Sequence, residues 1–387
     1  FYPLSSAQKR IYYACKMIGD ENIVYNIPGA ILVNSILDKE KVEKCFKEII
    51  KKQSSFRTSF MMINDSIMQK INKSVNFSVN TFKSKSTEIN DLINTFPKPF
   101  DLENAPLLRV ELHYLDNGKT LLLLESHHII VDGSSLEILI DEFCRLYNNT
   151  NIENLDIEYK DFAVWENKYL ESDMVKESEN YWVNKFKDSE IPVINLPYDF
   201  SVPSSKSYTG NTISKQISEK DFDKYITSAK KLGVSPYMFF LSTLFVLLYK
   251  YTGQEEIIVG SPVTGRSNNQ LQNIIGMFVN NIAVDGKIDS SKKFTEFLNN
   301  IKQQVLSDLE YQDYPYNLLV KKLDIPNNGS NNPLFDVMFA YQNANSNKLA
   351  LDDESVEIIK SVSGISKFNL SIEIEPDTRV VNWEYRT

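Results

Sequence analysis

Two adjacent histidines, His127 and His128, are the residues of this chain with the clearest chemical potential. They begin a stretch that ends in Asp132 and Gly133, and the sequence contains only one other histidine. The apolar run 120–130 predicts a buried β-strand, which the Asp-Gly pair then terminates. An imidazole at the end of a rigid strand is well placed to accept a proton, because its unperturbed pKa lies near ~6.5. The stretch therefore indicates a candidate site for proton transfer.

The neighbours of the histidine pair limit what this site can be. Adjacent strand residues point to opposite faces, so we expect at most one of the two imidazoles to face a cleft. His113 is predicted on a different strand and the spacing does not match zinc ligands, so no metal site is expected. We expect the Asp132 carboxylate to be buried and paired with a cation, with Arg57 and Arg266 as candidate partners. A direct role for Asp132 as a second base is the alternative.

The composition is that of an ordinary globular protein. Of 387 residues, 42% are hydrophobic and 24% are charged, and the net charge of −9 disfavours a nucleic-acid binder, which needs a basic surface. The most apolar stretch, 237–248, is too short to span a bilayer. Three cysteines without metal-ligand spacing or a secretory signal predict reduced thiols and a cytoplasmic protein. The chain begins with Phe1 and stops inside a strand-like pattern, so we interpret it as a piece of a longer polypeptide with a truncated C-terminal end.

Helices and strands are mixed in both halves of the chain, which predicts an α/β fold. In the first half we expect helices after Ser5 and Asp38 and strands at 28–33, 107–115 and 120–130. In the second half we expect helices at 219–232, after Ser235 and at 290–310, and strands at 257–259, 334–342, 356–359, 368–374 and 379–385. This order predicts two similar lobes, 1–175 and 176–387, with a cleft between them, and the segment 192–210 as a linker.

A series of motifs gives the chain a family likeness. They lie at 5–10 (S-x-A-Q-x-R), 56–60, 127–133 (H-H-x-x-x-D-G), 159–165, 275–280, 312–316 and 332–336. With these motifs in order, the chain resembles the condensation domains of non-ribosomal peptide synthetases, in the chloramphenicol-acetyltransferase-like superfamily. It is most similar to the type that joins two L-residues. Gln53 and Ser54 depart from the family's usual His-Glu pair, whereas the histidine motif is intact.

The resemblance implies two chloramphenicol-acetyltransferase-like lobes that form a V-shaped pseudo-dimer with a tunnel between them. It also implies peptide-bond formation, in which the α-amine of an acceptor aminoacyl thioester attacks a donor aminoacyl or peptidyl thioester. Both substrates arrive on the phosphopantetheine arms of upstream and downstream carrier domains, beside an adenylation domain of the same synthetase. The domain itself is therefore expected to bind no cofactor, and the pseudo-dimer predicts a monomer.

The resemblance also assigns roles within the catalytic stretch 127–133. The second histidine, His128, is the proton acceptor, and we expect the first to be structural. Gly133 leaves room for a pantetheine arm close to the backbone, although an ordinary turn glycine is the alternative. Ser135 either donates a hydrogen bond to the arm or caps the helix that begins there, and Asn280 is expected to line the tunnel.

Three alternative functions remain open at this point. An epimerase-type domain of the same fold shares the histidine motif but inverts an α-carbon. A free acyltransferase that uses coenzyme A is a second alternative. A non-catalytic recruitment domain of the same fold is the third, although such domains usually lack the histidine motif that this chain keeps.

Overall fold

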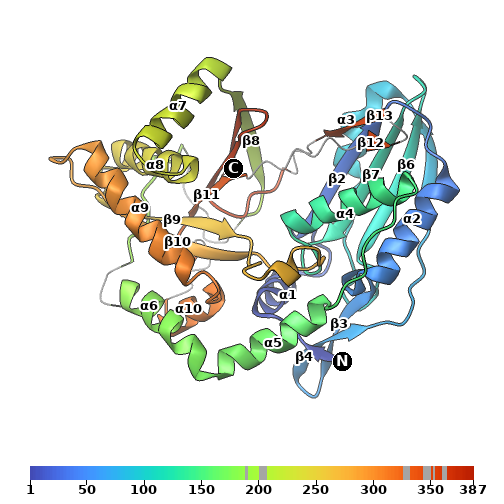
Figure 1. Ribbon diagram of the computed structural model, residues 1–387, viewed down its shortest axis with the longest axis horizontal. Coiled ribbons are helices and arrows are strands. Elements are labelled where there is room, and N and C mark those ends of the chain that lie inside the picture. Colours follow the sequence, from blue (N-terminus) through green and yellow to red (C-terminus); the bar gives the residue numbers. More distant parts are fainter. Residues whose placement is uncertain (188–190, 200–206, 326–331, 343–349, 352–353, 360–363) are drawn as a thin grey trace. The chain divides into compact units, whose positions relative to one another are not determined.

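The computed structural model in Figure 1 divides into two compact units. It describes residues 1–187, 191–199, 207–325, 332–342, 350–351, 354–359 and 364–387. Unit 1 comprises Phe1–Met174, Arg266–Val279 and Ser346–Ser363, and unit 2 comprises Val175–Gly265, Asn280–Asn345 and Gly364–Thr387. The first boundary lies beside the one expected at residue 175. Two segments of the second half nevertheless belong to unit 1, because hydrophobic periodicity reports local structure and not which core a segment joins.

Unit 1 is built on a six-stranded sheet in the order β12-β13-β2-β7-β6-β5. Its strands are β12 (Ala350–Leu351), β13 (Glu354–Ile359), β2 (Asn26–Val33), β7 (Thr120–His127), β6 (Leu108–Leu115) and β5 (Asn80–Ser84). Among the strand pairs of this sheet that the structure describes, only β5 and β6 are parallel. Strands β6 and β7 form an antiparallel hairpin, and Gly118 in its turn has a φ of +80° that favours glycine.

Strand β7 is the centre of this sheet and is buried along its whole length. Leu122 and Leu124 belong to the large core on one face, whereas Leu121 and Leu123 belong to a smaller core on the other. A strand covered on both faces is expected to be apolar throughout, which is why the sequence here shows a continuous apolar run. The covering elements therefore hold the end of β7 firmly in place.

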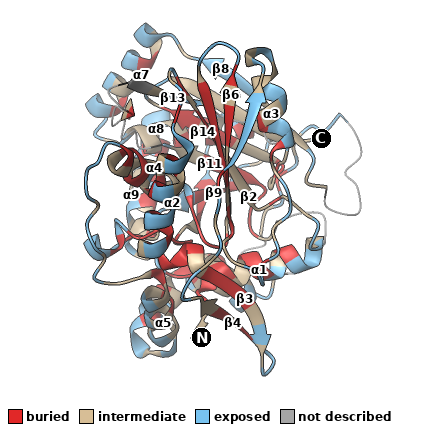
Figure 2. Cartoon of the chain, turned by 90° about the vertical axis from the view of Figure 1, so that its right-hand side faces the viewer, coloured by how far each residue is buried: buried red, intermediate tan, exposed pale blue. Residues whose placement is uncertain are grey.

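Of the helices described in unit 1, the first two begin where the sequence predicts, after Ser5 and Asp38. The described helices are α1 (Ser6–Ile18), α2 (Lys39–Lys52), α3 (Ile89–Thr95), α4 (Gly133–Tyr147) and α5 (Tyr159–Glu171). Ser5 caps α1 and Asp38 caps α2, and both caps are confirmed by side-chain bonds to backbone N–H groups. Helices α2 and α4 pack together through Phe46 and Phe143, whose ring centroids lie 4.9 Å apart. Helices α2 and α4 each have a buried and an exposed side (Figure 2). A small sheet of β1 (Tyr2–Pro3), β4 (Ser66–Ile71) and β3 (Thr58–Ile63) completes the unit.

Unit 2 has its own six-stranded sheet, in the order β10-β9-β11-β14-β15-β8. Its strands are β10 (Asn280–Lys287), β9 (Glu256–Val263), β11 (Val337–Tyr341), β14 (Leu370–Glu375), β15 (Val380–Arg386) and β8 (Gly210–Gln216). Its helices are α6 (Lys176–Phe186), α7 (Glu219–Lys231), α8 (Pro236–Thr252), α9 (Phe294–Glu310) and α10 (Tyr316–Lys322). The predicted cap of the apolar helix is confirmed, since Ser235 accepts from the N–H of Met238 and Pro236 follows it.

Taken singly, no helix in the described part of the chain has the length and apolar composition of a membrane span. Helices α7 and α8 meet the criteria of length and composition only when taken together, as a pair with a bend of 103°.

Candidate functional site

The histidine pair lies in a turn that joins β7 to α4 in unit 1. Strand β7 ends at His127 and α4 begins at Gly133, so the predicted strand 120–130 is wrong in its last three residues. Ile129 and Ile130 are still almost fully buried, at 0% and 1% exposure, because the turn itself enters the core. Burial and hydrogen-bonded pairing therefore end at different residues, and the apolar pattern follows burial.

His128 is held at both its backbone and its ring. Its N–H donates to the carbonyl of Tyr25 at 2.7 Å, and its Nδ1 lies 2.8 Å from the carbonyl oxygen of Val131. A carbonyl can only accept, so Nδ1 carries the proton and the lone pair resides on Nε2. The half-buried ring is thereby fixed in the tautomer in which Nε2 is the basic atom.

His127 is buried and turned into unit 1. Its Nδ1 accepts from the backbone N–H of Ile129 at 3.2 Å, so in the neutral ring Nε2 carries the hydrogen. That Nε2 lies 3.7 Å from the Sγ of Cys15, and the ring meets Phe100 edge-on with centroids 6.2 Å apart. These contacts support the structural role expected for the first histidine.

Asp132 joins the turn to the start of α4 and to segment 266–279. Its Oδ1 accepts from the N–H and the hydroxyl of Ser135, at 2.8 and 2.7 Å, and from Nη2 of Arg266 at 3.1 Å. Its Oδ2 accepts from the N–H of Phe278 at 3.0 Å. Asp132 is fully buried and Arg266 is 6% exposed, so this is an ion pair shielded from water. Its hydrogen bonds compensate for the loss of hydration.

Of the two candidate cations, Arg266 is therefore the partner of Asp132. Arg57 as a partner is wrong, because its guanidinium donates to the carbonyls of Ile50, Lys51 and Asn72. Arg57 also lies 3.9 Å from a carboxylate oxygen of Glu158. Sequence reasoning could not choose between the two arginines, since each stands beside a motif and the choice depends on where segment 266–279 runs.

The expectations for Ser135 need correction. The residue that caps α4 is Asp132 and not Ser135. The backbone N–H of Ser135 donates to the side chain of Asp132. Its hydroxyl is fully buried and lies 2.8 to 3.0 Å from the O and N of Gly276 and from Nη2 of Arg266. Through these hydrogen bonds Ser135 holds segment 266–279 in place. Because the residue is fully buried, its hydroxyl is not accessible to a ligand.

Asn280 also serves as an internal tie, within unit 2. Its amide donates to the carbonyls of Gln312 and Tyr314 at 2.9 and 2.7 Å and accepts from the N–H of Tyr316 at 3.1 Å. Each polar atom of this side chain is thus used to fix the loop before α10. The arrangement gives the asparagine a structural role, and the expectation that it lines a tunnel stays a prediction.

Gly133 is the exposed member of the motif, and local packing does not explain it. A Cβ built on Gly133 meets no atom within 4 Å, and its φ is not positive. Gly276 differs, because a Cβ there would lie 1.9 Å from the Cδ2 of Tyr159. A side chain at position 133 would therefore extend into open space, and the approach of a pantetheine arm to this backbone stays a prediction.

Sequence reasoning missed how completely segment 273–279 is bound by side chains of unit 1. Its backbone groups are bonded by Arg10, Gln53, Ser55, Asp132, Ser135, Tyr159 and Arg266. Gln53, one of the departures from the resembled family, binds both the carbonyl of Asn273 and the N–H of Ile275. The hydroxyl of Tyr159 donates to the carbonyl of Met277, and burial raises the pKa of Tyr159 well above its usual value. The available signal was that these residues fall in or beside motifs that are distant in sequence.

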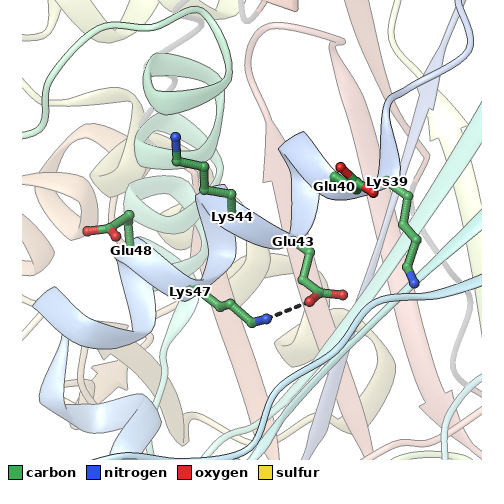
Figure 3. A pocket seen from close by; sticks show the side chains of 6 residues that line it. All are labelled: Lys39, Glu40, Glu43, Lys44, Lys47 and Glu48. Atoms are coloured by element: carbon green, nitrogen blue, oxygen red, sulfur yellow. Dashed lines mark hydrogen bonds and ion pairs between the residues drawn. The ribbon is translucent and has the colours of Figure 1, made fainter.

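A shallow hollow on α2 lies outside this site (Figure 3). It is lined by Lys39, Glu40, Glu43, Lys44, Lys47 and Glu48, and Lys47 pairs with Glu43 at 2.5 Å. No residue of the histidine turn lines it, so we assign it no part in the chemistry. Among the residues that the structure describes, no group of three His, Cys, Asp or Glu side chains is arranged to hold a metal ion.

Comparisons with known proteins give a family match over the whole chain. The family model described as "Condensation domain" matches residues 1–387. Tyrocidine synthase 3 of Brevibacillus parabrevis is 39% identical over 377 residues, which cover 97% of this chain and 6% of that protein. Gramicidin S synthase 2 of Aneurinibacillus migulanus is 40% identical over 374 residues, which cover 96% of this chain and 8% of that protein. The chain thus spans less than a tenth of the length of either relative.

A solved structure gives the same result for the fold. The condensation domain from the monacolin K polyketide synthase superposes with a TM-score of 0.90 at 17% identity, covering 100% of this chain and 92% of that one. At this level of identity the likeness concerns the fold alone, and it confirms the predicted mixed α/β class.

Proposed function

This chain belongs to the condensation-domain family of the non-ribosomal peptide synthetases, and we propose that it forms a peptide bond between two carrier-bound substrates. The donor is an aminoacyl or peptidyl thioester, and the acceptor is an aminoacyl thioester with a free α-amine. Both are carried on phosphopantetheine arms, so the domain itself binds no cofactor in this proposal. The observation that carries it is the intact histidine turn, in which the Val131 carbonyl fixes the tautomer of His128.

In the proposed step the acceptor amine attacks the carbonyl carbon of the donor thioester. A C–N bond forms, the C–S bond breaks, the amine loses a proton and the departing thiolate gains one. We assign the transfer of this proton to Nε2 of His128, the basic nitrogen in the observed tautomer.

The sizes of two catalytic effects, proton transfer and the positioning of the reactants, indicate that His128 does more than accept a proton. General base catalysis contributes roughly 10²–10⁴-fold, whereas holding two tethered reactants together gives effective molarities on the order of 10⁵–10⁸ M. Because the second effect is larger, we propose that His128 also orients the attacking amine. The hydrogen bond from Nδ1 supports this role, since a ring that must orient another group must itself be fixed.

The neighbours of this domain are also part of the proposal, because the chain spans only 6–8% of the two relatives. We propose an upstream and a downstream carrier domain and an adenylation domain of the same synthetase as its partners. A monomeric state, a cytoplasmic location and a tunnel that admits the two arms remain predictions.

A two-carrier assay tests the proposed function. The donor and acceptor carriers are loaded with amino acids, the full polypeptide is added, and the carrier-bound products are identified by mass spectrometry. We expect a dipeptidyl thioester on the acceptor carrier. A D-residue without dipeptide would instead indicate an epimerase-type domain, and the absence of both products a recruitment domain.

The substitution Gly133→Leu tests whether a pantetheine arm passes the open space at this glycine. We expect Gly133→Leu to fold, because Gly133 is exposed and a Cβ there meets no atom within 4 Å. We expect kcat/KM for carrier-bound substrates to fall about tenfold or more, which corresponds to ~1.4 kcal/mol of lost transition-state binding. Unfolding in urea and the two-carrier assay measure the two effects. A variant that retains its kcat/KM would reduce Gly133 to a turn glycine.

A further inference from the structure

Ile129 follows His128 directly, and side chains form hydrogen bonds with both its backbone N–H and its backbone carbonyl. The N–H of Ile129 donates to Nδ1 of His127 at 3.2 Å, and its carbonyl accepts from Nε2 of Gln8 at 3.3 Å. Ile129 is fully buried, and Val131, whose carbonyl fixes the ring of His128, is fully buried as well. Leaving a buried backbone group unpaired costs about 1–3 kcal/mol, so these two side chains hold the turn in its observed conformation.

Gln8 comes from α1 and reaches the turn with a defined orientation. Its Oε1 accepts from the N–H of Ser5 at 3.1 Å, and its own N–H donates to the hydroxyl oxygen of Ser5 at 3.1 Å. Because Oε1 faces a backbone donor, the amide nitrogen must face the carbonyl of Ile129. Gln8 is 1% exposed, so water cannot easily replace it.

We propose that Gln8 is a positioning residue for His128, an inference that rests on the proposed function. Gln8 does not touch the reacting atoms. It binds the carbonyl of Ile129, between the backbone of His128 and the carbonyl of Val131 that holds the Nδ1 of the ring. The S-x-A-Q-x-R motif and the histidine motif are thus joined through one amide hydrogen bond, and the polar part of α1 serves the chemistry as well as the fold.

A displacement of this turn should affect turnover more than substrate binding. Releasing the Ile129 carbonyl allows the peptide to rotate, and the ring of His128 moves with the Val131 carbonyl to which it is bonded. A misplacement of about 1 Å can cost roughly 10²-fold in rate, whereas Gln8 is 1% exposed and offers a docking carrier almost no surface.

The substitution Gln8→Glu isolates this hydrogen bond. Glutamate keeps an oxygen for the N–H of Ser5 but cannot donate to the Ile129 carbonyl when it is ionised. A matched control is Gln69→Glu, because Gln69 is also 1% exposed and its Nε2 donates to a backbone carbonyl, that of Pro3, at 2.8 Å. Gln69 lies in β4 and has no contact with the histidine turn among the described interactions.

Both variants and the unmodified chain are compared in the full polypeptide with the two-carrier assay. We expect Gln8→Glu to lower kcat about 10- to 100-fold with KM for the carriers changed less than twofold, and Gln69→Glu to leave both constants unchanged per folded molecule. Stability is measured for each by urea unfolding. Should Gln8→Glu fail to fold, the neutral variant Gln8→Met, of similar length and without a donor, replaces it in the comparison.

The outcomes separate this inference from the proposed function. If the unmodified chain forms no dipeptidyl thioester, the proposed function is wrong. If it does, and the Gln8 variant lowers kcat per folded molecule no more than Gln69→Glu does, Gln8 is only structural and the inference is overturned.

Discussion

Replacement of His128 by alanine is expected to lower the rate of dipeptidyl thioester formation by roughly 10²–10⁴-fold, the usual contribution of a general base. The variant should fold, because His128 is only half-buried and its N–H bond to Tyr25 is made by the backbone. The carrier-loading assay gives kcat, and urea unfolding gives the stability. Binding of the two carriers should change little, since the imidazole acts after they have docked.

A second histidine provides the control for this experiment. His113 lies in β6, is 5% exposed and is bonded to Ser84 at 2.9 Å. Burial lowers the pKa of His113, although the neighbouring carboxylate of Glu111 opposes this effect. We expect His113→Gln to lose stability while each folded molecule retains its rate. Full activity in His128→Ala would exclude a catalytic role for this imidazole.

Replacement of Asp132 by asparagine is expected to lower the free energy of unfolding by about 3–5 kcal/mol, the usual cost of removing one partner from a buried ion pair. The carboxylate binds Ser135, Phe278 and Arg266 through both of its oxygens. An amide has only one accepting oxygen, and its NH₂ group would face donors. The variant should therefore leave the charge of Arg266 buried and incompletely paired, and urea unfolding measures this loss.

An exposed pair provides the control for the Asp132 experiment. Asp20, which lies just after the C-terminal end of α1, is 2.7 Å from Lys16 in an exposed pair that solvent screens, so Asp20→Asn should unfold at the same urea concentration as the unmodified chain. A soluble Asp132→Asn variant with unchanged stability and no activity would contradict the ion-pair role. That result would make the carboxylate a direct participant in the chemistry.

Much of the fold was predictable because local rules were obeyed. The helix starts at Ser5, Asp38 and Ser235 were readable from their side chains, which bind backbone N–H groups of the first turn. Strands β14 and β15 were readable from their apolar patterns. The end of β7 was misplaced because the buried turn after it is as apolar as the strand.

The candidate site was predictable in part. The resemblance pointed to the histidine motif, but the partner of Asp132 and the contacts of Ser135 and Asn280 depend on chain segments that meet only in the folded protein. The role of Gln8 was equally hidden, because a buried amide on a helix has no pattern that names the carbonyl it will bind.

The sequence by itself determined where most helices and strands form, that the chain carries an intact histidine motif, and which family it resembles. These properties depend on residue types and on spacings of a few positions, and both are local. The tertiary structure alone decided that segment 266–279 joins unit 1, that Arg266 neutralises Asp132, and which nitrogen of His128 carries the proton. Each of these depends on a buried polar group finding its partner, in the first two cases more than 100 residues away, and burial makes that pairing obligatory without encoding it in any local pattern.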